Sequence, residues 1–178
     1  MKTYLFIALT LIFVSCDSTK KTVAETNEVE TPSKLIVNDG TCPEQGTCSF
    51  QIKEGTQFSV AKDGTGAIYP TYEDSEGSVA EFRYQEKGPE GTADGDYAEV
   101  IQFNIPASIG KGKSYTGETL QEVTLLYYKE CFCKGQAGYY KVTQGALKLY
   151  TNANGELNFD LQFTADVVNQ TIRRIVKG

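Results

Sequence analysis

Five cysteines carry the most reactive side chains of this sequence, which contains no histidine. Without histidine, the chain cannot build a Ser-His-Asp or Cys-His catalytic arrangement or a histidine-ligated metal site. An enzyme would instead need paired carboxylates, a lysine or a bound metal ion. Any reactive or metal-binding site of this chain would therefore use its cysteines or its acidic residues.

Cys16 follows a short N-terminal segment that is typical of exported proteins. Lys2 supplies a positive charge, residues 5–14 are almost wholly apolar, and Ser15 places a small residue directly before Cys16. The apolar run is shorter than the roughly 20 residues of a membrane-spanning helix, so it indicates a signal peptide. The pattern resembles a bacterial lipoprotein signal, whose cysteine is lipidated and becomes the mature N-terminus. We predict a signal peptide over 1–15 and lipidation of Cys16 with palmitate or a similar acyl chain; an ordinary signal peptide is the alternative.

The other four cysteines form two close pairs, Cys42 and Cys48 in TCPEQGTC, and Cys131 and Cys133 in CFCKGQAGYY. An even number of cysteines in an exported chain predicts two disulfide bonds. On an extended strand, residues two apart have Cα atoms about 6.6 Å apart, which leaves their Cβ atoms beyond the reach of a disulfide. We therefore favour crossed bonds between the two pairs, which would also close longer loops. Local pairing within each motif stays open, because two glycines after the second motif could bend it.

Two other kinds of chemistry suit these four cysteines less well. Four thiolates could bind zinc, but the usual two-residue spacing between cysteine ligands is missing, and an export compartment is oxidising. A Cys-x-Cys pair could exchange disulfides with other proteins, but the surrounding sequence lacks the βαβ pattern of thioredoxin-like proteins. We therefore expect structural disulfides, no metal at the cysteines and no cofactor.

The two cysteine motifs also carry a resemblance to known proteins. TCPEQGTC, followed far downstream by CFCKGQAGYYKVTQG, resembles a group of small envelope lipoproteins from Gram-negative bacteria. The similarity spans most of residues 36–178 and rests on cysteine and glycine positions. It implies a lipid-anchored envelope protein, in the outer membrane, and it implies no particular activity.

One polar loop is rich in carboxylates, with Asp94, Asp96 and Glu99 following Glu90. Carboxylate oxygens suit Ca²⁺, so these residues are a candidate calcium site. The loop lacks the full EF-hand pattern, and a solvated acidic loop is the simpler interpretation.

Two pairs of adjacent tyrosines, Tyr127-Tyr128 and Tyr139-Tyr140, are a candidate ligand-binding surface. Successive side chains of a strand point to opposite faces, so one tyrosine of each pair should lie on the outside of a sheet. Exposed aromatic rings on a sheet can stack against sugars. The alternative is that these tyrosines only build strands and place their hydroxyls at the rim.

The elements that position these residues are predicted to be strands, because apolar and polar residues alternate along most of the chain. The clearest strand is 157–163, which follows the hairpin turn Asn154-Gly155. We also expect a loop over 107–119, a buried strand over 120–128, a hairpin centred on Gly145 and a charged edge strand over 172–176. Leu120, Val123, Thr124 and Tyr127 also fit one side of a short helix, which is the alternative for that segment.

About nine or ten short strands without a long helix predict an all-β fold. The expected architecture is an antiparallel β-sandwich, with a closed β-barrel as the alternative. Residues 35–178 should form this single domain. Residues 16–34 have little to bury, so we expect the lipidated cysteine to be followed by a flexible tether.

The formal net charge of −6 excludes nucleic acid as a natural partner, because like charges repel. We expect a lipid-anchored envelope module that meets the membrane through its N-terminal lipid and binds a protein or glycan partner without catalysing a reaction. A hydrolase that uses acidic residues and a structural component of an envelope complex are the alternatives.

Overall fold

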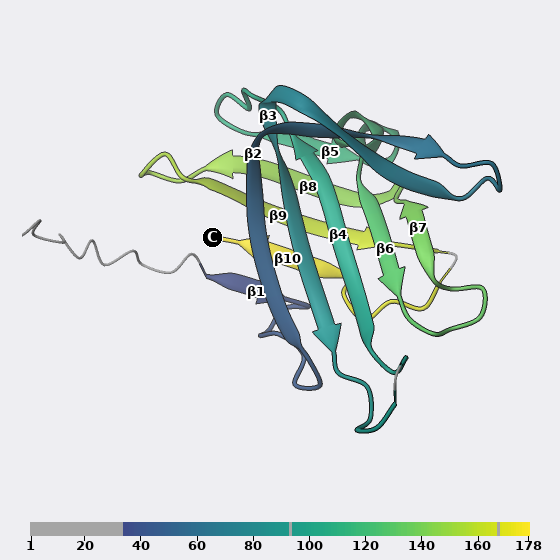
Figure 1. The fold of residues 1–178 in the computed structure, drawn as a ribbon. Coiled ribbons are helices and arrows are strands. Elements are labelled where there is room, and N and C mark those ends of the chain that lie inside the picture. Colours follow the sequence, from purple (N-terminus) through teal and green to yellow (C-terminus); the bar gives the residue numbers. More distant parts are fainter. Residues whose placement is uncertain (1–33, 93, 167) are drawn as a thin grey trace, which may run out of the picture. The chain divides into compact units, whose positions relative to one another are not determined.

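The computed structural model describes residues 34–92, 94–166 and 168–178, so the predicted signal peptide, Cys16 and all but the last residue of the predicted tether lie outside the described residues. In the described part of the chain, ten strands form two five-stranded antiparallel sheets that pack against each other (Figure 1). Each sheet has its own two edge strands. The predicted all-β sandwich is confirmed.

Most strands of each sheet follow one another directly in the sequence. The first sheet contains, in spatial order, β1 (Leu35–Val37), β10 (Arg174–Lys177), β9 (Leu157–Thr164), β8 (Gln144–Thr151) and β5 (Lys113–Thr116). The second sheet contains β2 (Thr47–Lys62), β3 (Ile68–Glu86), β4 (Tyr97–Ile105), β6 (Leu126–Glu130) and β7 (Gly138–Lys141). A short 3-10 helix, η1 (Gly117–Val123), leads into β6.

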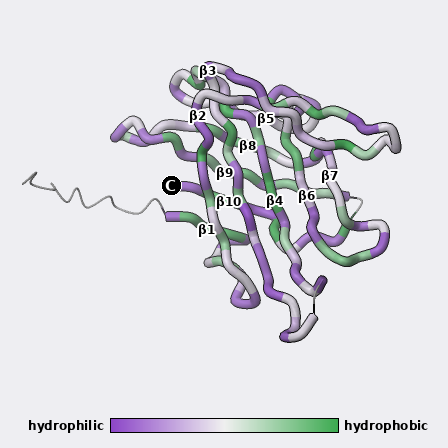
Figure 2. The backbone as a smooth tube through the Cα atoms, viewed as in Figure 1, coloured by the Kyte–Doolittle hydropathy of each residue, from purple (hydrophilic) through white to green (hydrophobic). Residues whose placement is uncertain are grey.

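The core lies between the inner faces of the two sheets. Phe103 of β4 contacts Phe159 of β9, with ring centroids 5.2 Å apart. The period of two along β9 buries Phe159, Leu161 and Phe163 and leaves Gln162 exposed. Figure 2 shows hydrophobic stretches on strands of both sheets. Full burial of one such apolar side chain contributes about 1.5–3 kcal/mol, so this inner face holds the sheets together.

The predicted strand over 120–128 is wrong in its first half. Gly117–Val123 forms η1, and Thr124 ends it with a left-handed backbone (φ 51°) before β6 begins. Leu120 and Val123 are both fully buried, because residues three apart share one side of a helix. The predicted loop over 107–119 also contains strand β5.

Two predicted neighbour relationships are wrong as well. The hairpin expected around Gly145 is a crossing between sheets, since β7 pairs with β6 whereas β8 pairs with β9 and β5. The C-terminal strand β10 is not an edge strand, because β1 covers its other side. The hairpin turn at Asn154-Gly155 is confirmed, and it joins β8 to β9.

Strands β2 and β3 form a hairpin much longer than the short strands predicted there. Their register shifts between Glu54 and Thr56, where Gly55 adopts a left-handed backbone (φ 68°). At the same point β3 passes close to the end of β4, where a Cβ on Gly77 would lie 2.6 Å from the Ile105 carbonyl oxygen. The two glycines therefore permit the hairpin to bend.

Beyond the bend, the outer half of this hairpin folds across the outer face of the second sheet toward β7 (Figure 1). Phe58 is buried there against Val79 and Leu126. The backbone N–H and carbonyl of Phe58 bond the side-chain amide of Asn104 at 3.0 and 2.8 Å. A small second core thus lies outside the sandwich, beneath the hairpin.

Each disulfide closes within its own motif, so the preference for crossed pairing is wrong. Cys42 is bonded to Cys48, with Cα atoms 5.8 Å apart, and Cys131 to Cys133, with Cα atoms 5.2 Å apart. The premise of an extended CFC segment does not hold, because β6 ends at Glu130. The bend that follows brings the two Cα atoms closer than the about 6.6 Å of a strand.

Candidate ligand-binding face

The four tyrosines of the predicted surface divide between the two faces of the second sheet. Tyr127 is fully buried in the sandwich, and Tyr140 also packs inward, where its hydroxyl donates to the Gln136 carbonyl oxygen at 2.9 Å. Tyr128 and Tyr139 lie opposite each other on β6 and β7. Their half-buried rings stack on the outer face, with centroids 4.2 Å apart. Two of the four are therefore placed to meet a ligand.

A third tyrosine, Tyr72, joins this outer surface from the folded-over hairpin. Its side chain is 47% exposed, and its hydroxyl accepts a hydrogen bond from Gln102 Nε2 at 2.8 Å. The Lys53 ammonium lies 5.6 Å from the ring centroid, within the range of a cation–π contact. Tyr72 could not be found from the sequence, because the bend of the hairpin decides where its ring lies.

Burial and the neighbouring Tyr128 and Tyr72 raise the pKa of Tyr139. The Tyr139 side chain also packs against the small second core around Phe58. The ring of Phe58 in turn lies beside Tyr72, with ring centroids 5.9 Å apart. The three outer tyrosines are therefore close neighbours, held in place by the core beneath the hairpin.

Glu81 is the hydrogen-bond acceptor for the polar side chains beside Tyr72. Its carboxylate accepts hydrogen bonds from Lys53 Nζ at 2.7 Å, Gln51 Nε2 at 2.5 Å and Gln102 Nε2 at 2.6 Å. Burial acts to raise the pKa of Glu81, but these three hydrogen bonds outweigh it and hold the pKa below its ordinary value of 4.5. Glu81 is therefore a fixed negative charge at neutral pH.

A cavity of about 420 Å³ lies at the other end of this surface, beside Tyr128. Phe132, which is 88% exposed, forms part of its lining together with Asp96 and Glu130. Glu130 accepts a hydrogen bond from Arg83 at 2.7 Å, and Asp96 accepts one from a loop backbone N–H at 2.9 Å. We name Tyr72, Tyr139, Tyr128 and Phe132 the aromatic face.

The structure does not bring the three candidate calcium ligands together. Asp94 and Asp96 line the outer cavity, whereas Glu99 is fully buried in the sandwich. There the Glu99 carboxylate accepts from the Tyr97 hydroxyl and from the backbone N–H groups of Thr171 and Ile172 at 2.6 and 2.9 Å. The described residues contain no group of three or more His, Cys, Asp or Glu that could hold a metal ion.

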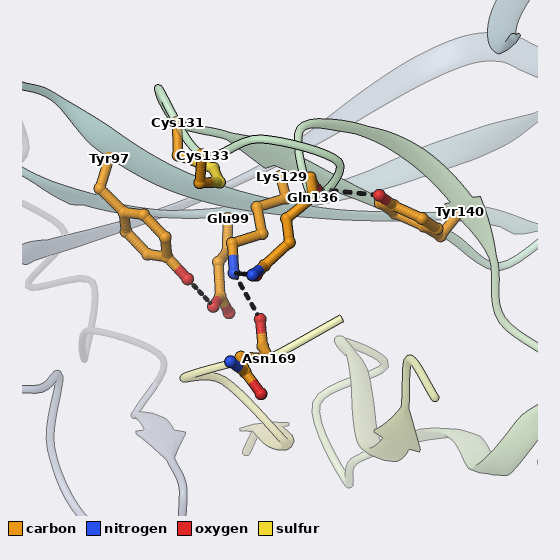
Figure 3. Close-up of a disulfide and its surroundings, with 8 residues drawn as sticks. All are labelled: Tyr97, Glu99, Lys129, Cys131, Cys133, Gln136, Tyr140 and Asn169. Carbon is orange, nitrogen blue, oxygen red and sulfur yellow. Dashed lines mark hydrogen bonds between the residues drawn. A yellow bond between two sulfur atoms is a disulfide. The ribbon is translucent and has the colours of Figure 1, made fainter. Parts of the chain in front are cut away.

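Lys129 is the second buried charge of the sandwich and was not singled out from the sequence. Its ammonium donates to the Asn169 carbonyl oxygen at 2.7 Å and to Gln136 Oε1 at 2.9 Å (Figure 3). It also lies 5.4 Å from the ring centroid of Tyr97. The alternation along β6 offered a signal, since Lys129 occupies an inward position next to Tyr127.

No helix in the described ranges combines the length and hydrophobicity needed to cross a membrane. No protein-family model matches the chain, and no curated protein and no solved structure is significantly similar to it.

Proposed function

We propose that this protein is a lipid-anchored, non-enzymatic module of the cell envelope that binds a carbohydrate through its aromatic face. The anchor rests on the sequence, in which an apolar segment of export-signal length ends at Cys16. The resemblance of the cysteine motifs to envelope lipoproteins supports the same location. The binding role rests on the stacked rings of Tyr128 and Tyr139, which are extended by Tyr72 and Phe132.

The chemistry of the aromatic face suits a sugar. Aromatic rings offer flat apolar surfaces to the C–H faces of pyranose rings. The Tyr72 hydroxyl accepts its hydrogen bond from Gln102, so its own proton can be donated to a ligand. Carboxylates lie at both ends, Glu81 beside Tyr72 and Asp96 in the outer cavity, and that of Asp96 could accept from a sugar hydroxyl.

The three tyrosines of the aromatic face are also held in place before a ligand arrives. Tyr128 is stacked on Tyr139, and Tyr72 is held by Gln102 and by the Lys53 ammonium. Binding would therefore immobilise few additional side chains, which lowers its entropic cost.

Calorimetric titration of the full-length protein with peptidoglycan fragments and with outer-membrane oligosaccharides tests the binding role. Tyr72→Ala and Tyr128→Ala should each weaken binding about tenfold, since stacking contributes of order 0.5–1.5 kcal/mol and the hydroxyl adds a hydrogen bond. Tyr69→Ala is the matched control, because Tyr69 is 41% exposed on the opposite side of the same hairpin. The binding role fails if no glycan binds, or if Tyr69→Ala weakens binding as much as Tyr72→Ala.

The anchor is tested separately by Cys16→Ser in a Gram-negative host. The variant should leave the membrane fraction, because no other stretch of the sequence is apolar enough to hold the chain there. Fractionation before and after a high-salt wash measures this. A variant that stays with the membrane through the wash would contradict lipid anchoring.

A further inference from the structure

Side chains hold the loop between β6 and β7 in place without help from its disulfide. The Gln136 side chain accepts from Lys129 Nζ at 2.9 Å, and the Gln136 carbonyl oxygen accepts from the Tyr140 hydroxyl at 2.9 Å (Figure 3). The Gln136 backbone N–H donates to the Cys133 carbonyl oxygen at 3.1 Å. None of these bonds has a sulfur atom as donor or acceptor, so none of them is itself removed when the Cys131–Cys133 bond opens.

The two disulfides differ in how they contact the core. Cys42 and Cys48 both pack against the main core, and Cys48 belongs to strand β2. Cys131 and Cys133 belong to neither apolar cluster of the described residues. Their bond also encloses only one residue, so it restricts the unfolded chain less than the Cys42–Cys48 bond does.

The Cys131–Cys133 bond lies in a surface loop of the molecule. Both cysteines are partly exposed, and together with Phe132 and Lys134 they line a surface cavity of about 530 Å³. Phe132, between them, is 88% exposed and offers an apolar contact beside the two sulfur atoms. The exposed Lys134 places a positive charge in the same cavity, where it would favour a cysteine in its thiolate form.

We propose that Cys131–Cys133 is a thiol–disulfide exchange site for apolar, cysteine-containing segments of other proteins. The structural reasons are a loop that hydrogen bonds without sulfur also hold, two partly exposed cysteines, and an apolar side chain and a cation that line the same cavity. This activity goes beyond the proposed carbohydrate binding and does not depend on it.

The exchange needs only the Cys131–Cys133 disulfide and two thiols of the partner. A thiolate of the partner attacks one sulfur of the pair, an intermolecular S–S bond forms, and the Cys131–Cys133 bond breaks. The electron pair of the broken bond stays on the other cysteine as a thiolate near Lys134. A second thiolate of the partner then attacks the mixed disulfide. The partner leaves oxidised by two electrons, and Cys131 and Cys133 remain as two thiols after taking up two protons.

The test is a single turnover with the full-length oxidised protein and a synthetic peptide that carries two cysteines flanked by leucine and phenylalanine. After quenching by alkylation, mass spectrometry should show the peptide two hydrogens lighter and two alkyl groups on Cys131 and Cys133. The Cys42–Cys48 bond should react at least tenfold more slowly. Cys42→Ser/Cys48→Ser should keep the activity, and Cys131→Ser/Cys133→Ser should abolish it.

Phe132→Ser separates reactivity from partner binding and keeps both disulfides. It should slow exchange with the apolar peptide about fivefold and leave exchange with glutathione unchanged. A Cys131–Cys133 bond that stays closed with excess peptide, or both disulfides reacting at the same rate, would overturn the proposal. An unchanged rate for Phe132→Ser with the apolar peptide would overturn the role of Phe132 in recognising partners. Tyr72→Ala should exchange normally, which keeps the outcome independent of carbohydrate binding.

Discussion

Glu99 and Lys129 lie opposite each other on neighbouring strands β4 and β6, and both hold the same backbone segment, residues 169–172. The carboxylate accepts from Thr171 and Ile172, and the ammonium donates to the Asn169 carbonyl oxygen. This segment leads into β10 of the first sheet. Two buried charges of the second sheet thus fix the last connection of the fold.

We expect the loss of either charged group to be costly, because each satisfies buried hydrogen-bonding groups of residues 169–172. Glu99→Gln and Lys129→Met should each lower the free energy of unfolding by about 1–3 kcal/mol, because each leaves such groups without their charged partner. The double variant should lose less than the two single losses added together. Urea unfolding measures all three. Lys113→Met and Glu122→Gln are the control, because that pair is exposed and should change stability by less than about 1 kcal/mol.

Two neighbouring tyrosines should respond in opposite ways to the loss of a hydroxyl. The Tyr97 hydroxyl donates to Glu99, so Tyr97→Phe should cost about 1.5–3 kcal/mol. The Tyr127 hydroxyl is buried and has no hydrogen-bond partner among the described residues. Tyr127→Phe should therefore leave stability unchanged or raise it by up to about 1 kcal/mol. A large loss for Tyr127→Phe in thermal unfolding would show that its hydroxyl is satisfied after all.

The lowered pKa of Glu81 predicts a loss of stability in acid. Because the carboxyl is more acidic in the folded state, its contribution is fully present above the ordinary pKa of 4.5 and is lost as pH falls through the folded value. Wild type should therefore be more stable than Glu81→Gln at pH 7, and the difference should shrink as pH falls below about 4.5. Unfolding curves from pH 7 to 2.5 measure it. A difference that stays constant with pH would contradict the hydrogen bonds assigned to Glu81.

The local disulfides predict that non-reducing digestion separates the TCPEQGTC peptide from the CFCKGQAGYY peptide. Removing the Cys42–Cys48 bond with two alanines should cost about 2.5 kcal/mol or more, and removing Cys131–Cys133 about 1.5 kcal/mol or less. The difference follows from the smaller loop of the second bond and from the packing of the first against the core. Crossed peptides would contradict the observed pairing, and an equal loss for both bonds would contradict the stability difference expected from loop size and packing.

The start of the folded domain can be tested by truncation. Lys34, the last residue of the predicted tether, already exchanges backbone hydrogen bonds with Gly178 at 2.9 and 3.2 Å. A chain that begins at Pro32 should keep the melting temperature of the mature protein within a few degrees. A chain that begins at Asn38 should melt lower, because it lacks β1 and the buried Val37. Equal melting temperatures for the two would show that β1 adds nothing to stability.

The sequence by itself determined the class of the fold and most of its inner residues. Strand β9 shows why: an alternation of Phe159, Leu161 and Phe163 with polar residues needs only a period of two to select the buried side. The same local rule put one tyrosine of each adjacent pair on the outside, whereas the pairing of β6 with β7 set Tyr128 opposite Tyr139. The turn at Asn154-Gly155 is equally local, since it rests on the left-handed backbone of Gly155 and on hydrogen bonds among residues 152–156.

Tertiary structure alone decided which strands are neighbours and which of their side chains meet on one surface. Periodicity along β7 and β8 is the same whether they form a hairpin or belong to different sheets, because pairing depends on packing between distant segments. The bend at Gly55 brings Tyr72 beside Tyr139, and the bend after Glu130 joins Cys131 to Cys133. The place of Tyr72 and the disulfide in the loop after β6 both depend on points where the chain leaves regular strand geometry, and a rule of alternation cannot say in which direction such a chain continues.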